Sequence, residues 1–249
     1  MRQLIINADD FGLTPGCNAG IIRALTQGIV SDTTIMINTD YAQAAVELAK
    51  ANGIGRIGLH LNLTFGSPVS PVSEVASLVD GEGRFFRKIA RSVAGLDPLE
   101  VERELRAQVA KFLATGLSLT HLDSHHHAHT YPKITAMVVT LAKELGVPLR
   151  QTGPALRYLI KGARVATTEG FSPNFYDKGV TAENLKKIIG GWREGTLEIM
   201  CHPAEAGQLI YEISDYNACR ERELAILTDP EMKDFLQENG VRLIGFAEL

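Results

Sequence analysis

Short apolar runs alternate with amphipathic stretches along almost the whole chain. The runs are rich in β-branched residues and most stop at polar or glycine positions, which is typical of buried strands, whereas the stretches between them repeat apolar residues at helical spacing. We expect strands at residues 3–8, 29–37, 56–63, 117–124, 147–151, 196–201 and 241–246. We expect helices at residues 18–27, 41–51, 98–114, 132–144, 181–192, 217–227 and 231–237.

This alternation predicts an α/β fold with a parallel sheet. About seven strands, each followed by a helix or a long connection, favour a closed or nearly closed (β/α) barrel over an open sheet. Residues 64–96 and 153–179 lack periodicity, and such long segments usually line a site or cover it. Because the sequence contains no repeat, low-complexity tract or linker, we predict that residues 1–249 form a single domain.

Composition limits the classes of partner. The chain has 249 residues, 45% of them hydrophobic, and a formal net charge of -4, so it offers no basic field for a nucleic acid. The first apolar run is too short for a signal peptide or a membrane span. Three widely spaced cysteines argue against a disulfide framework and favour a reducing compartment. We therefore expect a cytoplasmic protein that acts on a small molecule.

Histidine is concentrated in one segment. Five of the seven histidines lie within residues 121–129, and the other two, His60 and His202, follow short apolar runs. Imidazole is the commonest metal ligand, and a carboxylate among imidazoles suits a divalent ion with an open coordination position. The segment therefore predicts a metal site, although a solvated histidine-rich tract is the simpler alternative.

Several candidates fall at the predicted carboxyl ends of strands, where barrel enzymes carry their active residues. Asp9 and Asp10 are adjacent, so their side chains leave in different directions, and one can bind metal while the other transfers protons. Helix or turn capping is the alternative for this pair. His60 is a candidate ligand or a buried core histidine. His202 is a candidate acid or base, or a buried histidine with a structural hydrogen bond.

The strand period of two places four polar residues of the central segment on one face, provided the strand continues that far. They are His121, Asp123, His125 and His127. A catalytic metal typically has about three protein ligands and a water, so the surplus must contact the ligands or the substrate instead. Asp123 is suited to fix the tautomer of a neighbouring imidazole, and a structural hydrogen bond is its alternative role.

Other catalytic classes lack their motifs. The sequence has neither a phosphate-binding glycine-rich loop nor a Gly-x-Ser-x-Gly elbow, which removes the support for a kinase or a serine hydrolase. Glycoside hydrolysis by Asp9 and Asp10 would leave the histidines without a role.

Four segments carry a resemblance to a known family: Asn7 to Gly12, Gly58 to His60, His121 to His129 and Cys201 to Pro203. In order and spacing they resemble the YdjC/ChbG-like carbohydrate deacetylases. The resemblance implies a distorted (β/α) barrel, similar to the nodulation-type polysaccharide deacetylases, with an Asp-His-His metal site. By position it makes Asp10, His60 and His125 the metal ligands, with His127 as the substitute for His125 if the strand register differs. It makes Asp9 the catalytic base and His202 the acid. By the ligand count above, Asp123 and His127 then contact the ligands or the substrate.

The resemblance also implies a substrate and a cofactor. It implies hydrolysis of the acetamide of N-acetylated chitooligosaccharides such as diacetylchitobiose, dependence on Mg²⁺, and a possible homodimer. Two imidazoles and one carboxylate suit Zn²⁺ or another transition metal better than Mg²⁺, so the metal stays open. The alternatives are a barrel that binds metal or sugar without catalysis, and a metal-dependent sugar isomerase or phosphoesterase.

Overall fold

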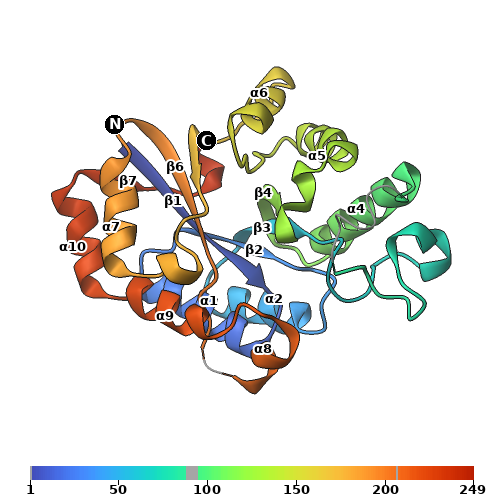
Figure 1. Cartoon of the computed structure of the whole chain (residues 1–249), viewed down its shortest axis with the longest axis horizontal. Coiled ribbons are helices and arrows are strands. Elements are labelled where there is room, and N and C mark those ends of the chain that lie inside the picture. The colour runs from blue at the N-terminus through green and yellow to red at the C-terminus, as the bar shows by residue number, and fades with distance from the viewer. Residues whose placement is uncertain (1, 88–94, 206) are drawn as a thin grey trace.

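The computed structural model describes residues 2–87, 95–205 and 207–249, and in this part of the chain seven strands form one sheet surrounded by helices (Figure 1). The strands are β1 (Arg2–Phe11), β2 (Asp32–Ile35), β3 (Arg56–Leu61), β4 (Ser118–Ser124), β5 (Gly170–Ser172), β6 (Gly195–Cys201) and β7 (Val241–Leu243). The α-helices are α1 (Pro15–Gln27), α2 (Ala42–Ala51), α4 (Pro98–Leu113), α5 (Pro132–Leu145), α6 (Pro154–Gly162), α7 (Ala182–Gly191), α8 (Gln208–Ile213), α9 (Ala218–Leu227) and α10 (Pro230–Glu238). None of the described helices is both long and apolar enough to cross a lipid bilayer.

β1 is the centre of the sheet. The strand order is β4-β3-β2-β1-β6-β5, and β7 also pairs with β1. Every pairing is parallel, which confirms the predicted parallel α/β sheet. The first residues of β1 pair with β7, its last residues pair with β2, and β6 runs along its other side. The carboxyl end of β1 therefore opens in the middle of the sheet's carboxyl edge.

The barrel is distorted and is not closed by strand pairing. Beyond β4, only an isolated bridge between Leu122 and Leu149 continues the sheet, so the strand expected at residues 147–151 is wrong. One backbone hydrogen bond, from Leu149 to Ala166, reaches toward the opposite side. The segment expected to be irregular at residues 153–179 instead contains α6 and β5. No strand of the described residues therefore joins the edge strands β4 and β5.

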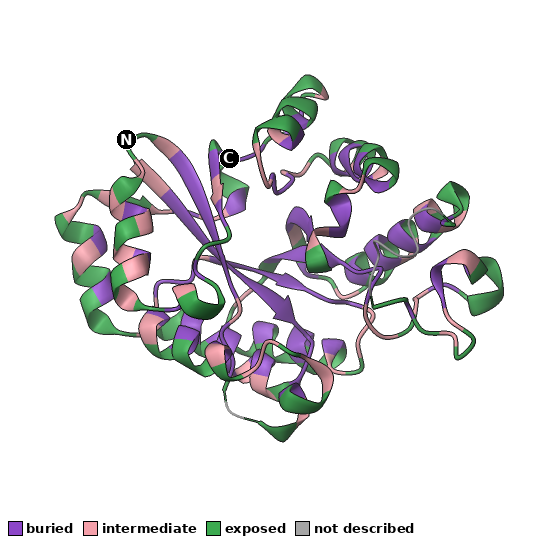
Figure 2. Cartoon of the chain, in the orientation of Figure 1, coloured by how far each residue is buried: buried purple, intermediate pink, exposed green. Residues whose placement is uncertain are grey.

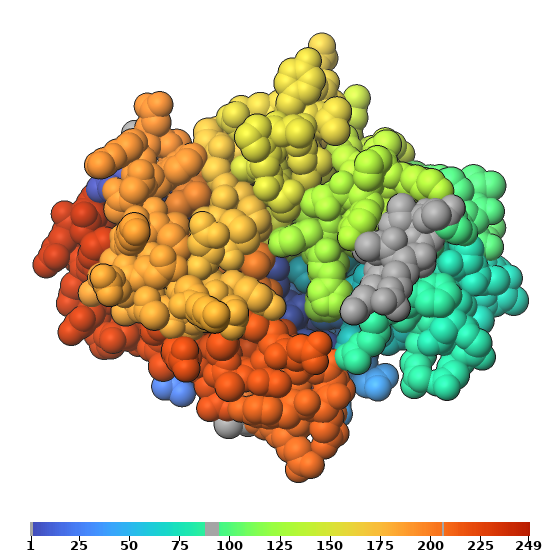
Figure 3. All heavy atoms as spheres, in the orientation of Figure 1, coloured from blue at the N-terminus to red at the C-terminus, as the bar shows by residue number. Residues whose placement is uncertain are grey.

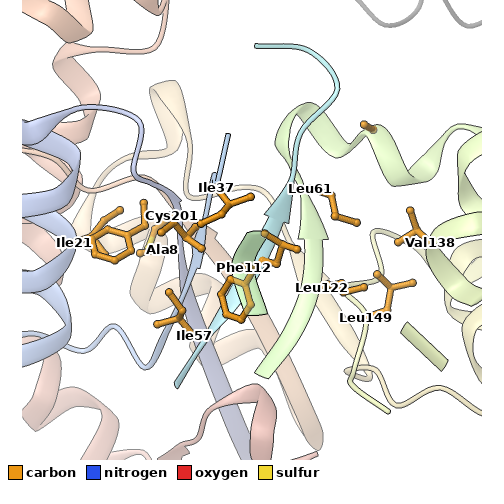
Figure 4. Packing of buried hydrophobic residues seen from close by; sticks show 14 of the residues in the cluster. Ala8, Ile21, Ile37, Ile57, Leu61, Phe112, Leu122, Val138, Leu149 and Cys201 are labelled. Carbon is orange, nitrogen blue, oxygen red and sulfur yellow. The ribbon is translucent and has the colours of Figure 1, made fainter. Parts of the chain in front are cut away.

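Several helices begin at a capping residue whose side chain accepts a hydrogen bond from a free backbone N–H group. Thr14 accepts a hydrogen bond from the Cys17 N–H at the start of α1, and Asp97 does the same for Leu99 at the start of α4. Their apolar faces then pack on the sheet, so buried positions lie inward and exposed positions outward (Figure 2). In Figure 4, the Phe112 ring of α4 lies within this buried cluster.

The long connection after β3 is tied to α4 by buried polar groups. Both carboxylate oxygens of Glu104 accept hydrogen bonds, from the N–H groups of Val69 and Ser70. The Gln108 amide bonds both the N–H and the C=O of Asn62. This connection corresponds to the irregular segment expected at residues 64–96, of which residues 88–94 lie outside the described residues. These hydrogen bonds hold the first part of the connection against α4, beside the end of β3.

Gly58 makes room for one histidine of the central segment. The His121 ring is fully buried and stacks on Phe246, with ring centroids 3.7 Å apart. A Cβ atom on Gly58 would lie 2.4 Å from His121 Cε1 and 2.6 Å from Thr34 Cγ2. Burial lowers the pKa of His121 to about 3, so the imidazole is neutral. His121 therefore fills the barrel interior.

We expect Gly58→Ala to lower the free energy of unfolding by about 1–3 kcal/mol, because the added methyl group overpacks the contact with His121. Gly55→Ala is the matched control, since a Cβ atom there would meet nothing within 4 Å. Urea unfolding followed by circular dichroism measures both changes. Equal effects of the two substitutions would contradict this packing role.

Candidate active site

The Asp9-Asp10 pair lies at an irregularity in β1. The pairing of β1 with β2 shifts register between Ala8 and Phe11, so the two aspartates interrupt the regular ladder. Asp10 has φ of 70°, a left-handed conformation that aspartate tolerates better than most residues. Both side chains are buried. The irregularity sends the two carboxylates to different partners, as the sequence predicts.

Asp10 lies together with His60 and His125. Asp10 Oδ1 is 2.9 Å from His125 Nδ1 and 3.5 Å from His60 Nε2. One ligand atom from each residue lies within 4.8 Å of the other two. Asp10 Oδ1 is buried and accepts no hydrogen bond of good geometry. One free carboxylate oxygen facing two imidazoles fits a divalent metal ion.

Asp123 holds the other side of His60. Its Oδ1 lies 2.7 Å from His60 Nδ1, and its Oδ2 accepts a hydrogen bond of 3.0 Å from the Thr34 hydroxyl. Burial alone would lower the pKa of His60, but the charge of Asp123 outweighs it and raises that pKa to about 9. Near pH 7 His60 therefore carries a proton on each ring nitrogen. A metal ion would have to replace the proton on Nε2, which faces Asp10, while Asp123 keeps the proton on Nδ1, as is typical of a metal-ligating histidine.

Arg150 is buried between carboxylates from different strands. Its Nη1 and Nη2 atoms bond the two oxygens of Asp9 at 2.6 and 2.7 Å, and Nη1 is also 2.8 Å from Asp123 Oδ2. Its Nε atom donates to Glu198 at 2.6 Å. Burial raises the pKa of Asp9, but Arg150 outweighs that effect and lowers it below the ordinary value. Asp9 is therefore held as a carboxylate.

The same guanidinium removes a second possible metal position. Asp9, His60 and Asp123 also lie close enough for one ion. The Nη1 atom of Arg150, however, already contacts an oxygen of each aspartate. A fixed protein cation thus stands where an ion would have to enter. Of these two groups, only the one around Asp10 is open to metal.

Arg220 of α9 binds the second oxygen of Asp10. Its Nη2 atom lies 2.7 Å from Asp10 Oδ2, and its Nε atom donates to the Tyr216 carbonyl. Burial raises the pKa of Asp10, but His125 and Arg220 outweigh it and hold that pKa well below the ordinary range. Asp10 therefore keeps a negative charge and offers Oδ1 alone.

His202 lies after β6 on the same edge of the sheet. Its backbone N–H donates to Glu223, whose other oxygen accepts from the Tyr216 hydroxyl. The His202 Nδ1 atom is 3.9 Å from Glu223 and has no hydrogen-bond partner among the described residues. Burial lowers the pKa of His202 to about 4, so the imidazole is neutral near pH 7. The ring can take up a proton only during a reaction.

The backbone after β4 turns the remaining histidines of the central segment in different directions. β4 ends at Ser124, where the sequence predicts its end, and His126 and His127 then adopt φ of 52° and 50°. The condition that the strand continues to His127 is therefore not met, and the period of two does not place His125 and His127 on one face. His125, and not His127, lies beside Asp10. His127 instead points an edge at Phe171, and His129 Nδ1 is 2.5 Å from the Ser124 hydroxyl.

Sequence reasoning missed the two buried arginines and Glu223. Arg150 follows the apolar Val147–Leu149 run, where a charged residue is itself a signal for a buried ion pair. Arg220 and Glu223 lie on a charged helical pattern that is indistinguishable in sequence from an exposed face.

The site opens to solvent. Figure 3 shows a hollow in the middle of this face, with dark blue atoms from the beginning of the chain at its bottom. The yellow-green segment after β4 and orange segments from the last third of the chain border it. A small molecule can therefore approach the end of β1.

Comparison with known proteins places the chain among related sequences. A family model described as YdjC-like protein matches residues 3–238. A protein of Brevibacillus brevis named carbohydrate deacetylase is 42% identical, and the match covers 99% of each chain. The solved structure of an Enterococcus faecalis V583 protein, described with a proposed role in cellobiose-phosphate cleavage, is 33% identical, with a TM-score of 0.93 and coverage of 99% of this chain and 98% of that one.

More distant structures share the fold alone. A family 4 carbohydrate esterase from Streptomyces lividans, solved in complex with acetate, has a TM-score of 0.53 at 10% identity. The match covers 97% of this chain and 91% of that one.

We expect Arg150→Met to destabilise the protein by about 3–5 kcal/mol, because it leaves Asp9 and Asp123 buried without their partner. Arg106→Met removes ion pairs to Glu102 and Glu144 that are exposed, so its unfolding midpoint should hardly change. Urea titration of both variants gives the comparison. An Arg150→Met protein as stable as the Arg106→Met protein would show that the buried network does not hold the barrel together.

Proposed function

The chain belongs to the YdjC-like family, as its sequence resemblance predicts, and from that premise we propose that it is a metal-dependent carbohydrate deacetylase. The reaction is hydrolysis of the acetamide of an N-acetylated sugar, which gives acetate and a free amine. The single observation that carries this proposal is the buried Asp10 Oδ1 atom, which faces two imidazoles and has no hydrogen bond of its own.

Asp10, His60 and His125 would hold the ion. When bound, a divalent metal lowers the pKa of a coordinated water and polarises the amide carbonyl. The protein contributes the geometry. Arg220 occupies one oxygen of Asp10, and Asp123 fixes the Nδ1 side of His60, so each side chain has one atom left to offer.

Asp9 is assigned as the base that takes the proton of the attacking water. Arg150 keeps it ionised and Asn7 donates a further hydrogen bond of 2.8 Å, so the carboxylate cannot rotate freely. An ionised, fixed carboxylate next to the ligand Asp10 suits this role. A barrel that only binds metal or sugar would have no use for it.

His202 is assigned as the group that delivers a proton to the leaving amine. The attacking water loses one proton, and the nitrogen gains one as the C–N bond breaks. The reaction therefore needs no proton from outside the site. Because burial keeps the imidazole neutral, His202 must receive that proton during turnover. The Glu223 side chain accepts a hydrogen bond from the His202 backbone N–H, which positions the residue after the end of β6.

The substrate and the ion are narrower parts of the proposal. Diacetylchitobiose is the first substrate to test, following the resemblance, and the relatives named carbohydrate deacetylase support the broader class. Magnesium follows from the same resemblance, but the two imidazole donors favour Zn²⁺ or another transition metal, which we propose instead. A homodimer and a cytoplasmic location stay predictions.

We expect the wild-type protein to release acetate from N,N′-diacetylchitobiose and Asp9→Asn to lose about 10²–10⁴-fold in turnover while keeping its metal. His202→Ala should lose turnover within the same range. An enzyme-coupled acetate assay measures all three proteins, with isomerisation and phosphate release assayed in parallel. Near wild-type turnover in Asp9→Asn would exclude it as the base, and wild-type protein that releases no acetate from any N-acetylated disaccharide would exclude the function.

Metal content gives an independent test of the ligands. We expect elemental analysis to find one transition-metal ion per wild-type chain, and less than a tenth of that in His60→Ala and His125→Ala. His127→Ala, in the same segment, should keep its ion, because His127 lies away from Asp10. Loss of metal from His127→Ala with retention in His125→Ala would reverse the assignment.

A further inference from the structure

Two tyrosine rings stand beside His202. Tyr176 and Tyr216 are stacked, with ring centroids 4.0 Å apart and planes within 13° of parallel. The His202 ring lies 5.6 Å from the first and 5.4 Å from the second, inclined by 69° to both. The imidazole thus packs edge-on against the stack. The two rings therefore lie directly beside the candidate proton donor.

The inner ring is held rigidly. The Tyr216 hydroxyl donates to the buried Glu223, and its backbone carbonyl accepts from Arg220. The Arg220 guanidinium carbon lies 5.4 Å from the centre of the Tyr216 ring, a cation–π contact. Since Arg220 also binds Asp10, the stack and the candidate ligand share one anchor.

The outer ring is left open. Tyr176 is 40% exposed although it lies against Tyr216, and among the described residues its aromatic neighbours are Tyr216 and His202. It comes from the connection between β5 and α7, far in sequence from Tyr216. An exposed aromatic face fixed from behind and set beside a reaction centre is preorganised for binding, because little freedom remains to be lost.

The chemistry of the ring indicates its ligand. One face of a pyranose ring presents C–H groups, which are apolar and slightly positive, and the face of an aromatic ring is apolar and negative. We propose that Tyr176 is the platform on which the sugar ring bearing the acetamide stacks. This inference rests on the proposed deacetylase function, because it places the amine nitrogen of that ring toward His202.

Binding can be separated from chemistry by using the Asp9→Asn background, which we expect to bind sugar without turning it over. Titration calorimetry with N,N′-diacetylchitobiose should give about tenfold weaker binding when Tyr176→Ala is added, the loss typical of an aromatic contact. Tyr176→Phe keeps the ring and should bind within about twofold. Tyr158→Ala is the control, because Tyr158 is 80% exposed on α6, away from His202.

Kinetics gives a second readout. In the otherwise wild-type protein, Tyr176→Ala should raise KM for the disaccharide about tenfold and change kcat less, and Tyr158→Ala should change neither. If Tyr176→Ala leaves both the dissociation constant and KM within twofold, Tyr176 is not the platform. If the protein binds the disaccharide through Tyr176 but releases no acetate, the proposed deacetylase function is wrong and the role of Tyr176 in sugar binding is supported.

Discussion

The buried guanidinium of Arg150 is the interaction on which the site depends. It neutralises Asp9 and Asp123 inside the barrel, where a free carboxylate would cost several kcal/mol, and it reaches Glu198 as well. Burial raises the pKa of Glu198 to about 8, so this third partner is protonated near pH 7 and one cation serves two anions. The carboxylates can therefore be held at the centre of the sheet's edge.

The arrangement gives two neighbouring aspartates different chemistry. Asp9 is bound through both oxygens by a buried cation, so it stays ionised and has no oxygen free for a metal. Asp10 is bound by Arg220 through one oxygen only, and the other faces imidazole nitrogens. Arg150 contacts Asp123, and Asp123 in turn contacts His60. The same contacts therefore fix the positions of the proposed base and of the proposed metal ligand.

The sequence predicts the parallel sheet and most of the candidate site residues. The pairing of those residues with buried arginines depends on three-dimensional contacts. Parallel strands and the strand ends that carry Asp9, His60 and His202 follow from local periodicity. The left-handed conformation of His126 and His127 does not, because no glycine marks a positive φ there, so the choice of His125 over His127 needed the resemblance. The apolar run before Arg150 signals a buried ion pair, but its partner Asp9 lies 141 positions away, so the sequence does not identify that partner.

Crystallography with anomalous scattering tests the central claim most directly, namely that Arg150 directs a single ion to Asp10. For crystals grown with zinc, measured at its absorption edge, the account predicts one strong peak among Asp10, His60 and His125, with Arg150 still bonded to Asp9 and Asp123. A peak between Asp9 and Asp123, with the guanidinium displaced, would contradict it.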